Sequence, residues 1–215
     1  MSNEKQTFWS QNPASSRTTE DSFYLNMYRK SQIPCQRDNQ YPSREMEILI
    51  HVKNDIIIFV KNVMEKVMNG GEKSQVHLPL SQYIDYFQKI KYAFNLLGKT
   101  SHFLEESIVR ELVCSFFQSL EYVIYYCPDS ITLPKQINSP LLTDNAINLL
   151  KMNLKSNQIM YWRELGNAWT ESRNSWPSAF RPPPPAYIPT FYDGWKLPEI
   201  EPVKASTQTP GASKF

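Results

Sequence analysis

Three long segments of this sequence carry apolar side chains at alternating steps of three and four residues, running from about 43 to 70, 81 to 99 and 105 to 127. This spacing gathers the apolar groups on one face of an α-helix. The three stripes are Leu49, Val52, Ile56, Phe59, Val63 and Val67; Tyr83, Phe87, Ile90, Phe94 and Leu97; and Val109, Val113, Phe116, Leu120, Val123 and Cys127. Because such helices need partners to be stable, the sequence predicts an all-α, antiparallel bundle over residues 43–176.

Helix-breaking and capping residues mark where these segments end. Gly70-Gly71 stops the first helix and Pro128 stops the third. Thr143 is expected to cap a short fourth helix that ends near Met152. A fifth helix is expected to run from about Ser156 to Asn174.

The fifth predicted helix is rich in large side chains, and Trp162, Leu165 and Trp169 fall on one face of it. We expect these three residues to have a structural role and to pack inward, with Gly166 allowing close helix contact. Trp176 is expected to close the helix in a structural role of its own.

The composition changes on both sides of the predicted bundle. Residues 1–42 are polar and lack a sustained apolar period, so they are expected to form a flexible tail, as are residues 205–215. Residues 177–204 are rich in proline and aromatic residues, and Pro182–Pro185 favour an extended polyproline II conformation.

Charge and hydropathy exclude several classes of protein. The formal net charge of the 215 residues is only +2, which argues against nucleic-acid binding. The most apolar run, Leu112 to Cys127, is too short for membrane insertion and contains Glu121. The first residues lack the apolar stretch of a signal peptide, and the three cysteines include no C-x-x-C pair. These features predict a cytoplasmic protein.

The sequence offers few groups for catalysis. His51, His77 and His102 do not show the spacing of a helical zinc site, and there is no G-x-S-x-G or glycine-rich phosphate loop. We therefore expect no catalytic, metal-binding or cofactor-binding residue, and no enzymatic activity. Lys89 and Lys91, together with Lys99, are expected on the solvated side of the second helix.

The most specific short motif is P-P-x-Y, formed by Pro184, Pro185 and Tyr187, which is a candidate protein-binding site because WW domains recognise this pattern. SH3 patterns fit less well. The alternative is a structural strap that lies across the bundle, with Tyr187, Ile188, Phe191 and Trp195 packed against it. So many aromatic side chains are seldom left in water, which favours the strap.

Five segments together resemble the central region of the epidermal growth factor receptor kinase substrate 8 family of signalling adaptors. They are Glu47–Val60 (EILIHVKNDIIIFV), Tyr83–Gly98 (YIDYFQKIKYAFNLLG), Ser139–Thr143 (SPLLT), Trp162–Pro177 (WRELGNAWTESRNSWP) and Tyr187–Pro198 (YIPTFYDGWKLP). The resemblance implies a spectrin-like bundle and an adaptor that couples receptor tyrosine kinases to Rac activation and actin remodelling. It also implies protein partners in signalling and the cytoskeleton, and a place in the cytoplasm at the actin-rich cell cortex.

The chain departs from the family plan outside this region. Residues 1–42 are too few for the family's phosphotyrosine-binding domain, and neither the SH3 domain nor the actin-binding region follows. Two readings therefore stay open: an adaptor whose bundle binds a partner, or a structural helical spacer or truncated paralogue without actin or SH3 activity.

Overall fold

The computed structural model describes residues 44–70, 76–177 and 182–197. The predicted tails, 1–42 and 205–215, lie outside these residues, as does the end of the proline-rich segment from 198 to 204. The described residues form helices joined by loops, and their one β-bridge pairs Leu142 with Ser172.

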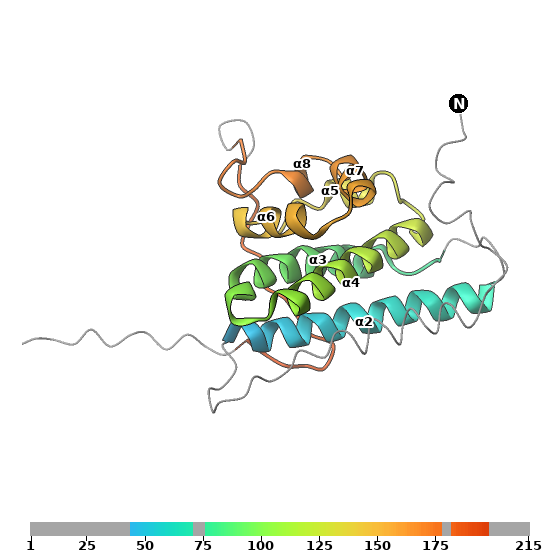
Figure 1. Cartoon of the computed structure of the whole chain (residues 1–215). Coiled ribbons are helices and arrows are strands. Elements are labelled where there is room, and N and C mark those ends of the chain that lie inside the picture. Colours follow the sequence, from blue (N-terminus) through green and yellow to red (C-terminus); the bar gives the residue numbers. More distant parts are fainter. Residues whose placement is uncertain (1–43, 71–75, 178–181, 198–215) are drawn as a thin grey trace, which may run out of the picture.

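Three long helices form the main layer. They are α2 (Arg44–Gly70), α3 (Leu80–Thr100) and α4 (Glu106–Tyr126), with the short 3₁₀ helix η1 (Ser101–Phe103) between α3 and α4. Successive long helices run in opposite directions and lie side by side (Figure 1). This confirms the predicted all-α antiparallel bundle, and each boundary falls within a few residues of the prediction. In the part of the chain that the structure describes, no helix is both long and apolar enough to cross a bilayer.

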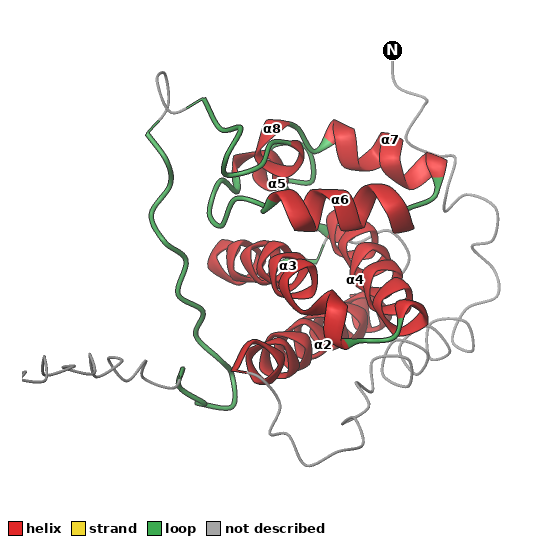
Figure 2. Ribbon diagram, turned by 60° about the vertical axis from the view of Figure 1, so that its left-hand side comes forward, coloured by secondary structure: helices red, strands yellow, loops and turns green. Residues whose placement is uncertain are grey.

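Four short helices cover the opposite side of α3 and α4 from α2 (Figures 1 and 2). They are α5 (Leu133–Gln136), α6 (Asp144–Asn153), α7 (Ser156–Glu164) and α8 (Asn167–Thr170). Thr143 Oγ1 accepts a hydrogen bond of 3.2 Å from the Ala146 amide at the start of α6. The predicted cap is therefore confirmed.

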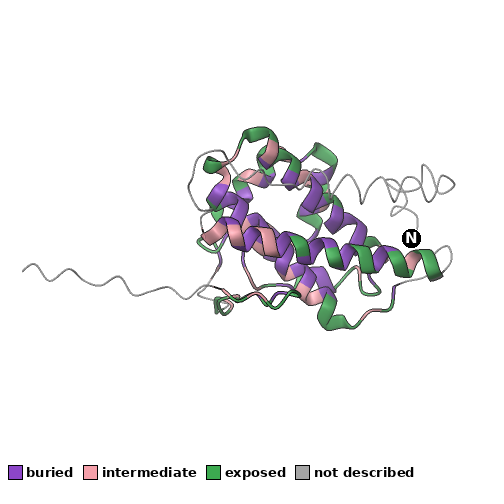
Figure 3. Ribbon diagram, turned by 90° about the horizontal axis from the view of Figure 1, so that it is seen from below, coloured by how far each residue is buried: buried purple, intermediate pink, exposed green. Residues whose placement is uncertain are grey.

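The core lies between the two layers and inside the main one, where buried positions line the facing sides of the helices (Figure 3). Every residue of the three predicted stripes is buried, apart from Val67, which packs half-buried against the core. Burial of these apolar faces is the main favourable contribution to the stability of the bundle.

The fifth predicted helix is wrong in its length. Helix α7 ends at Glu164, and α8 begins only after Gly166, whose φ of 84° favours glycine. Gly166 therefore turns the chain, and the expected close helix contact is absent because a Cβ there would meet open space. The predicted i, i+3, i+4 pattern could not reveal this break.

Trp162, Leu165 and Trp169 nevertheless gather in the core, with side chains 2%, 5% and 0% exposed. The Trp162 indole N–H donates to the Trp169 carbonyl at 2.9 Å, and the Trp169 indole N–H donates to the Pro134 carbonyl at 2.8 Å. These bonds satisfy the polar atoms that the two tryptophans bring into the core. Trp176 is also buried.

The close backbone approach occurs at Gly98 instead. An added Cβ there would lie 2.8 Å from the backbone nitrogen of Ala146 and 3.0 Å from the carbonyl carbon of Asn145. Both are backbone atoms at the start of α6, so neither can rotate away. Gly98 thus sets how closely α3 and α6 pack.

Two of the three lysines expected in solvent are buried. The Lys91 side chain is fully enclosed, and its ammonium donates to the carbonyls of Ile137 and Ala168, each at 2.7 Å. It also lies 5.2 Å from the centre of the Trp169 ring. The prediction was wrong for Lys91 because the layer of short helices covers its side of α3, and wrong for Lys89 because α2 lies against the other side, where Asp55 is 2.8 Å from its ammonium. Lys99 is exposed and pairs with Glu45.

The close approach of α3 and α6 predicts that Gly98→Ala destabilises the protein. Overpacking against backbone is expected to cost about 1–3 kcal/mol, which outweighs the gain of up to about 1 kcal/mol in helix propensity. Urea unfolding measures the change, with Gln82→Ala on the exposed start of α3 as the control. A Gly98→Ala variant more stable than the native protein would contradict this packing.

Burial of Lys91 predicts a rise in stability with pH. Removal from water lowers the pKa of Lys91 from 10.5 to about 7. Between these values the unfolded chain binds more protons, so the free energy of unfolding increases with pH, by at most about 1.4 kcal/mol for each pH unit. Urea unfolding at pH 7.5 and 9.0 should show that Lys91→Met loses this rise, whereas Lys99→Met keeps it. Equal pH dependence in the native protein and Lys91→Met would contradict the assignment.

Candidate interaction site on the proline-rich strap

Residues 182–197, called the strap below, run in an extended path from the layer of short helices to the start of α2 (Figure 2). Near the beginning of the strap the Ser139 hydroxyl donates to the Pro185 carbonyl at 3.1 Å. The Tyr187 ring then packs edge-on against Tyr92 of α3, with 5.3 Å between ring centres. The strap is thus held on the bundle from its proline run onward.

An aromatic cluster holds the far end of the strap. Phe191 is 8% exposed and lies 5.1 Å, centre to centre, from the Trp195 ring. The His51 ring of α2 stacks on Trp195 at 4.2 Å and meets Phe191 at 5.6 Å. Its Nδ1 also lies 2.6 Å from the Asp193 carboxylate. Stacking and a hydrogen-bonding contact therefore fix the same short turn to α2.

This turn has a local cause in the sequence. The Gly194 amide donates to the Phe191 carbonyl at 3.1 Å, and Gly194 has a φ of 77°. Asp193 accepts a hydrogen bond of 2.9 Å from the Trp195 amide, which lowers the pKa of its carboxyl group. Asp followed by Gly is a favourable pair in a tight turn. The turn directs Phe191 and Trp195 toward the same side.

A buried ionic network lies beneath Tyr192. The Lys89 ammonium is 2.8 Å from Asp55 of α2 and 2.7 Å from Asp85 of α3, and its side chain is 1% exposed. The Tyr192 amide donates to both Asp55 oxygens at 3.2 and 3.3 Å. The Tyr192 hydroxyl donates to Asp85 at 3.1 Å, and the ring lies 4.0 Å from Lys89 Nζ. The strap thus adds the last contacts around Lys89, a lysine that the bundle has buried.

Burial and nearby charge set the protonation of this network. Desolvation raises the pKa of Asp55, while the ion pair with Lys89 opposes that rise. Burial, together with the Asp85 charge, raises the pKa of Tyr192 above its usual value. The phenol therefore stays protonated at neutral pH and remains a donor to Asp85.

The residues of the P-P-x-Y motif differ in their exposure to solvent. Pro185 is exposed, whereas Pro184 and Tyr187 are half-buried. The Tyr187 hydroxyl oxygen is buried and has no hydrogen-bond partner among the described residues. Ile188 was expected on the bundle, but it is 72% exposed. That expectation was wrong because an extended chain cannot turn Ile188 and its neighbour Tyr187 to the same side.

The sequence did not reveal the residues that receive the strap, namely His51, Asp55, Asp85 and Lys89. The four-residue spacing of Asp85 and Lys89 was readable as a helical ion pair. Asp55 stands among the apolar residues of the first stripe, and a carboxylate in such a position needs a buried partner. Within the described ranges, no group of three or more His, Cys, Asp or Glu residues lies close enough to hold a metal ion.

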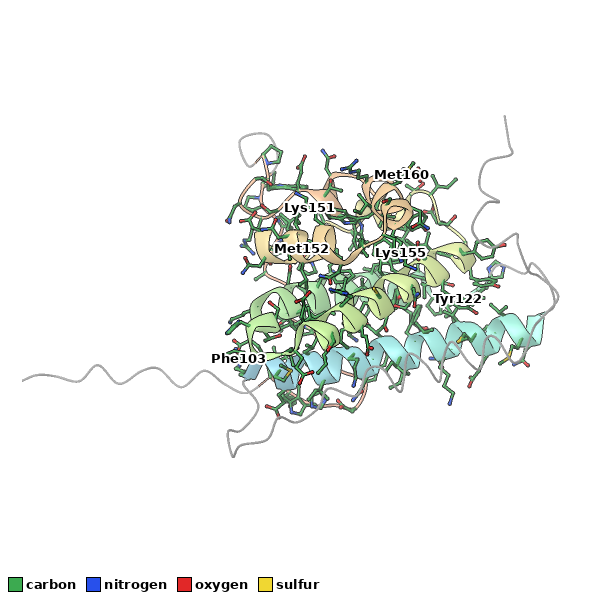
Figure 4. All side chains as sticks on the ribbon, viewed as in Figure 1. Phe103, Tyr122, Lys151, Met152, Lys155 and Met160 are labelled. Atoms are coloured by element: carbon green, nitrogen blue, oxygen red, sulfur yellow. The ribbon has the colours of Figure 1, made fainter. Side chains whose placement is uncertain are left out.

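A second set of exposed apolar side chains lies on the outer layer. Met152 of α6 and Met160 of α7 are 81% and 65% exposed. Figure 4 shows Lys151 and Lys155 in the same region. The strap, whose contacts with α2 and α3 are defined residue by residue, is the better defined candidate site.

The aromatic cluster predicts that Phe191→Ala loosens the end of the strap. Loss of the buried ring should speed hydrogen exchange of the Tyr192 and Trp195 amides, which donate to Asp55 and Asp193. Exchange measured by mass spectrometry over residues 187–197 checks this, and Ile188→Ala is the matched control because its side chain is exposed. Unchanged exchange in Phe191→Ala would show that the cluster does not hold the strap.

The family comparison covers most of the described chain. The EPS8 spectrin-like domain matches residues 44–177. Human epidermal growth factor receptor kinase substrate 8-like protein 3 is 43% identical over 166 residues, which cover 74% of this chain and 27% of that protein. The mouse protein of the same name is 39% identical over 168 residues, with the same coverage.

A more distant relative, rat epidermal growth factor receptor kinase substrate 8, is 27% identical over 186 residues, covering 77% of this chain and 22% of the relative. No solved structure gives a significant match. The chain thus spans about a quarter of the length of the curated relatives it matches. Because the spectrin-like domain occupies more than half of the sequence, the chain belongs to the EPS8 family.

Proposed function

We propose that this chain is a non-enzymatic adaptor or scaffold module that binds protein partners in receptor tyrosine kinase signalling. In this proposal it links Rac activation to actin remodelling in the cytoplasm, at the actin-rich cell cortex. Membership of the EPS8 family supports the adaptor role, because the curated relatives carry the names epidermal growth factor receptor kinase substrate 8 and substrate 8-like protein, which refer to signalling by a receptor kinase.

The observation that carries the proposal is the anchoring of the strap. A segment far from α2 in the sequence is held there by the hydrogen bonds of the Tyr192 amide to Asp55 and by the stack of His51 on Trp195. Releasing the strap would take this donor away from the buried Asp55 carboxylate, which is unfavourable, so the strap and the bundle behave as one body. A rigid body of this kind holds an extended segment in a fixed orientation for a partner.

A second function is favoured by the P-P-x-Y motif, which makes the strap a candidate ligand for a WW domain through Pro184, Pro185 and Tyr187. Tyr187 packs on Tyr92 while the strap is docked. WW binding therefore requires that this part of the strap first leaves the bundle. The remaining alternative is a structural spacer that binds no partner.

Proximity labelling in cultured cells tests the adaptor role. The full chain is fused to a biotin ligase, and an unrelated spectrin-like repeat of similar size carries the same fusion as the control. We expect the chain to enrich regulators of Rac or of actin filaments over the control, and the enriched proteins to bind the purified chain directly. Identical labelling by the two fusions would instead favour the spacer.

A further inference from the structure

Exposure along the first half of the strap repeats every three residues. Pro182, Pro185 and Ile188 are all exposed, and Ile188 is 72% exposed. Between them, Pro184 and Tyr187 are half-buried, while Pro183 and Ala186 are exposed. The period of three is that of a polyproline II helix, which has three residues in each turn.

The same period explains which residues face the bundle. Each proline fixes its own φ near the polyproline II value, and the residue before each proline is restricted to extended conformations. Pro184 and Tyr187, three positions apart, therefore lie on one edge, and Tyr187 packs on Tyr92. Two edges then face solvent, one with Pro183 and Ala186 and the other with Pro182, Pro185 and Ile188. We call the second edge, which carries the large apolar side chain of Ile188, the outer ridge.

We propose that the outer ridge, with the strap still docked, is a binding site for an SH3-type domain, whose aromatic-lined groove accepts a polyproline II ligand. Pro182 and Pro185 supply the P-x-x-P spacing that such a groove reads, and Ile188 supplies an apolar side chain one turn further on. This inference rests on the proposed adaptor function and names the class of partner that the strap fits.

Docking prepares the ridge for binding. The Ser139 hydroxyl holds the Pro185 carbonyl, and the Tyr187–Tyr92 contact holds the next turn. The buried Phe191 and Pro189 hold the chain just beyond Ile188. A partner therefore meets a segment whose ordering entropy has already been lost, and preorganisation of this kind raises affinity.

Binding at the outer ridge and binding at the P-P-x-Y motif favour different states of the strap, docked in the first case and released in the second. The ridge uses side chains that point away from the bundle, so it stays open while the strap is docked and binds more tightly because the strap is held. A WW domain needs the Tyr187 side chain, which docking covers. Releasing the strap therefore weakens binding in the first case and strengthens it in the second.

The test measures binding of the purified full chain to an array of purified SH3 domains, with purified WW domains on the same array. Native chain is compared with Pro182→Ser and Ile188→Ser, which alter the ridge, and with Tyr187→Phe, which removes a hydroxyl that has no partner among the described residues. Phe191→Ala weakens the anchoring of the strap at its far end, and a free peptide of residues 182–191 is the unanchored reference. Circular dichroism checks that each variant keeps the helical fold.

The proposal expects at least one SH3 domain to bind the native chain, and Ile188→Ser or Pro182→Ser to weaken that binding about tenfold. Tyr187→Phe should bind as the native chain does, while Phe191→Ala and the peptide should bind more weakly. Absence of any SH3 domain that binds the native chain overturns the proposal. So does binding that Phe191→Ala strengthens or that the two ridge variants leave unchanged.

These results are independent of the proximity-labelling experiment. If partners of the chain are found in cells but no SH3 domain recognises the ridge, the adaptor function stands and only the class of partner is wrong. If labelling matches that of the unrelated repeat, the adaptor function itself fails, whatever the array shows.

Discussion

The enclosure of α3 on all sides is the constraint on which the rest of the structure depends. From Tyr83 to Gly98 no residue of this helix is exposed, because α2, α4, the short helices and the strap all pack against it. An amphipathic helix with one stripe would need only one covered face. Here two charged side chains, Lys89 and Lys91, are covered as well, so each of them must find a partner inside the protein.

Two lysines show how that requirement is met. Lys91 faces the layer of short helices and donates to two of its carbonyls. Lys89 faces the other way, where Asp55, Asp85 and the ring of Tyr192 surround its ammonium. Each buried lysine thereby ties a separate part of the chain to α3. The strap is held by the chemistry of the bundle rather than by its own secondary structure.

This attachment links the fold to the proposed function. Anchors at Tyr187 and Phe191 decide which edge of the polyproline segment faces α3, and so which edge a partner meets. A free peptide exposes all three edges of a polyproline II helix, whereas the docked strap turns the edge with Pro184 and Tyr187 toward the bundle. The fold therefore selects the outer ridge over the tyrosine of the P-P-x-Y motif.

The sequence by itself determined the helical elements of the main layer, their apolar faces and the Thr143 cap, because the helical period and capping preferences are local properties. It did not determine the burial of Lys89 and Lys91, the tight contact at Gly98 or the direction of Ile188. These depend on which segments far apart in the chain come to lie against α3. Only the tertiary structure decided them, because the surroundings of a side chain are set by packing between elements and not by the period within one.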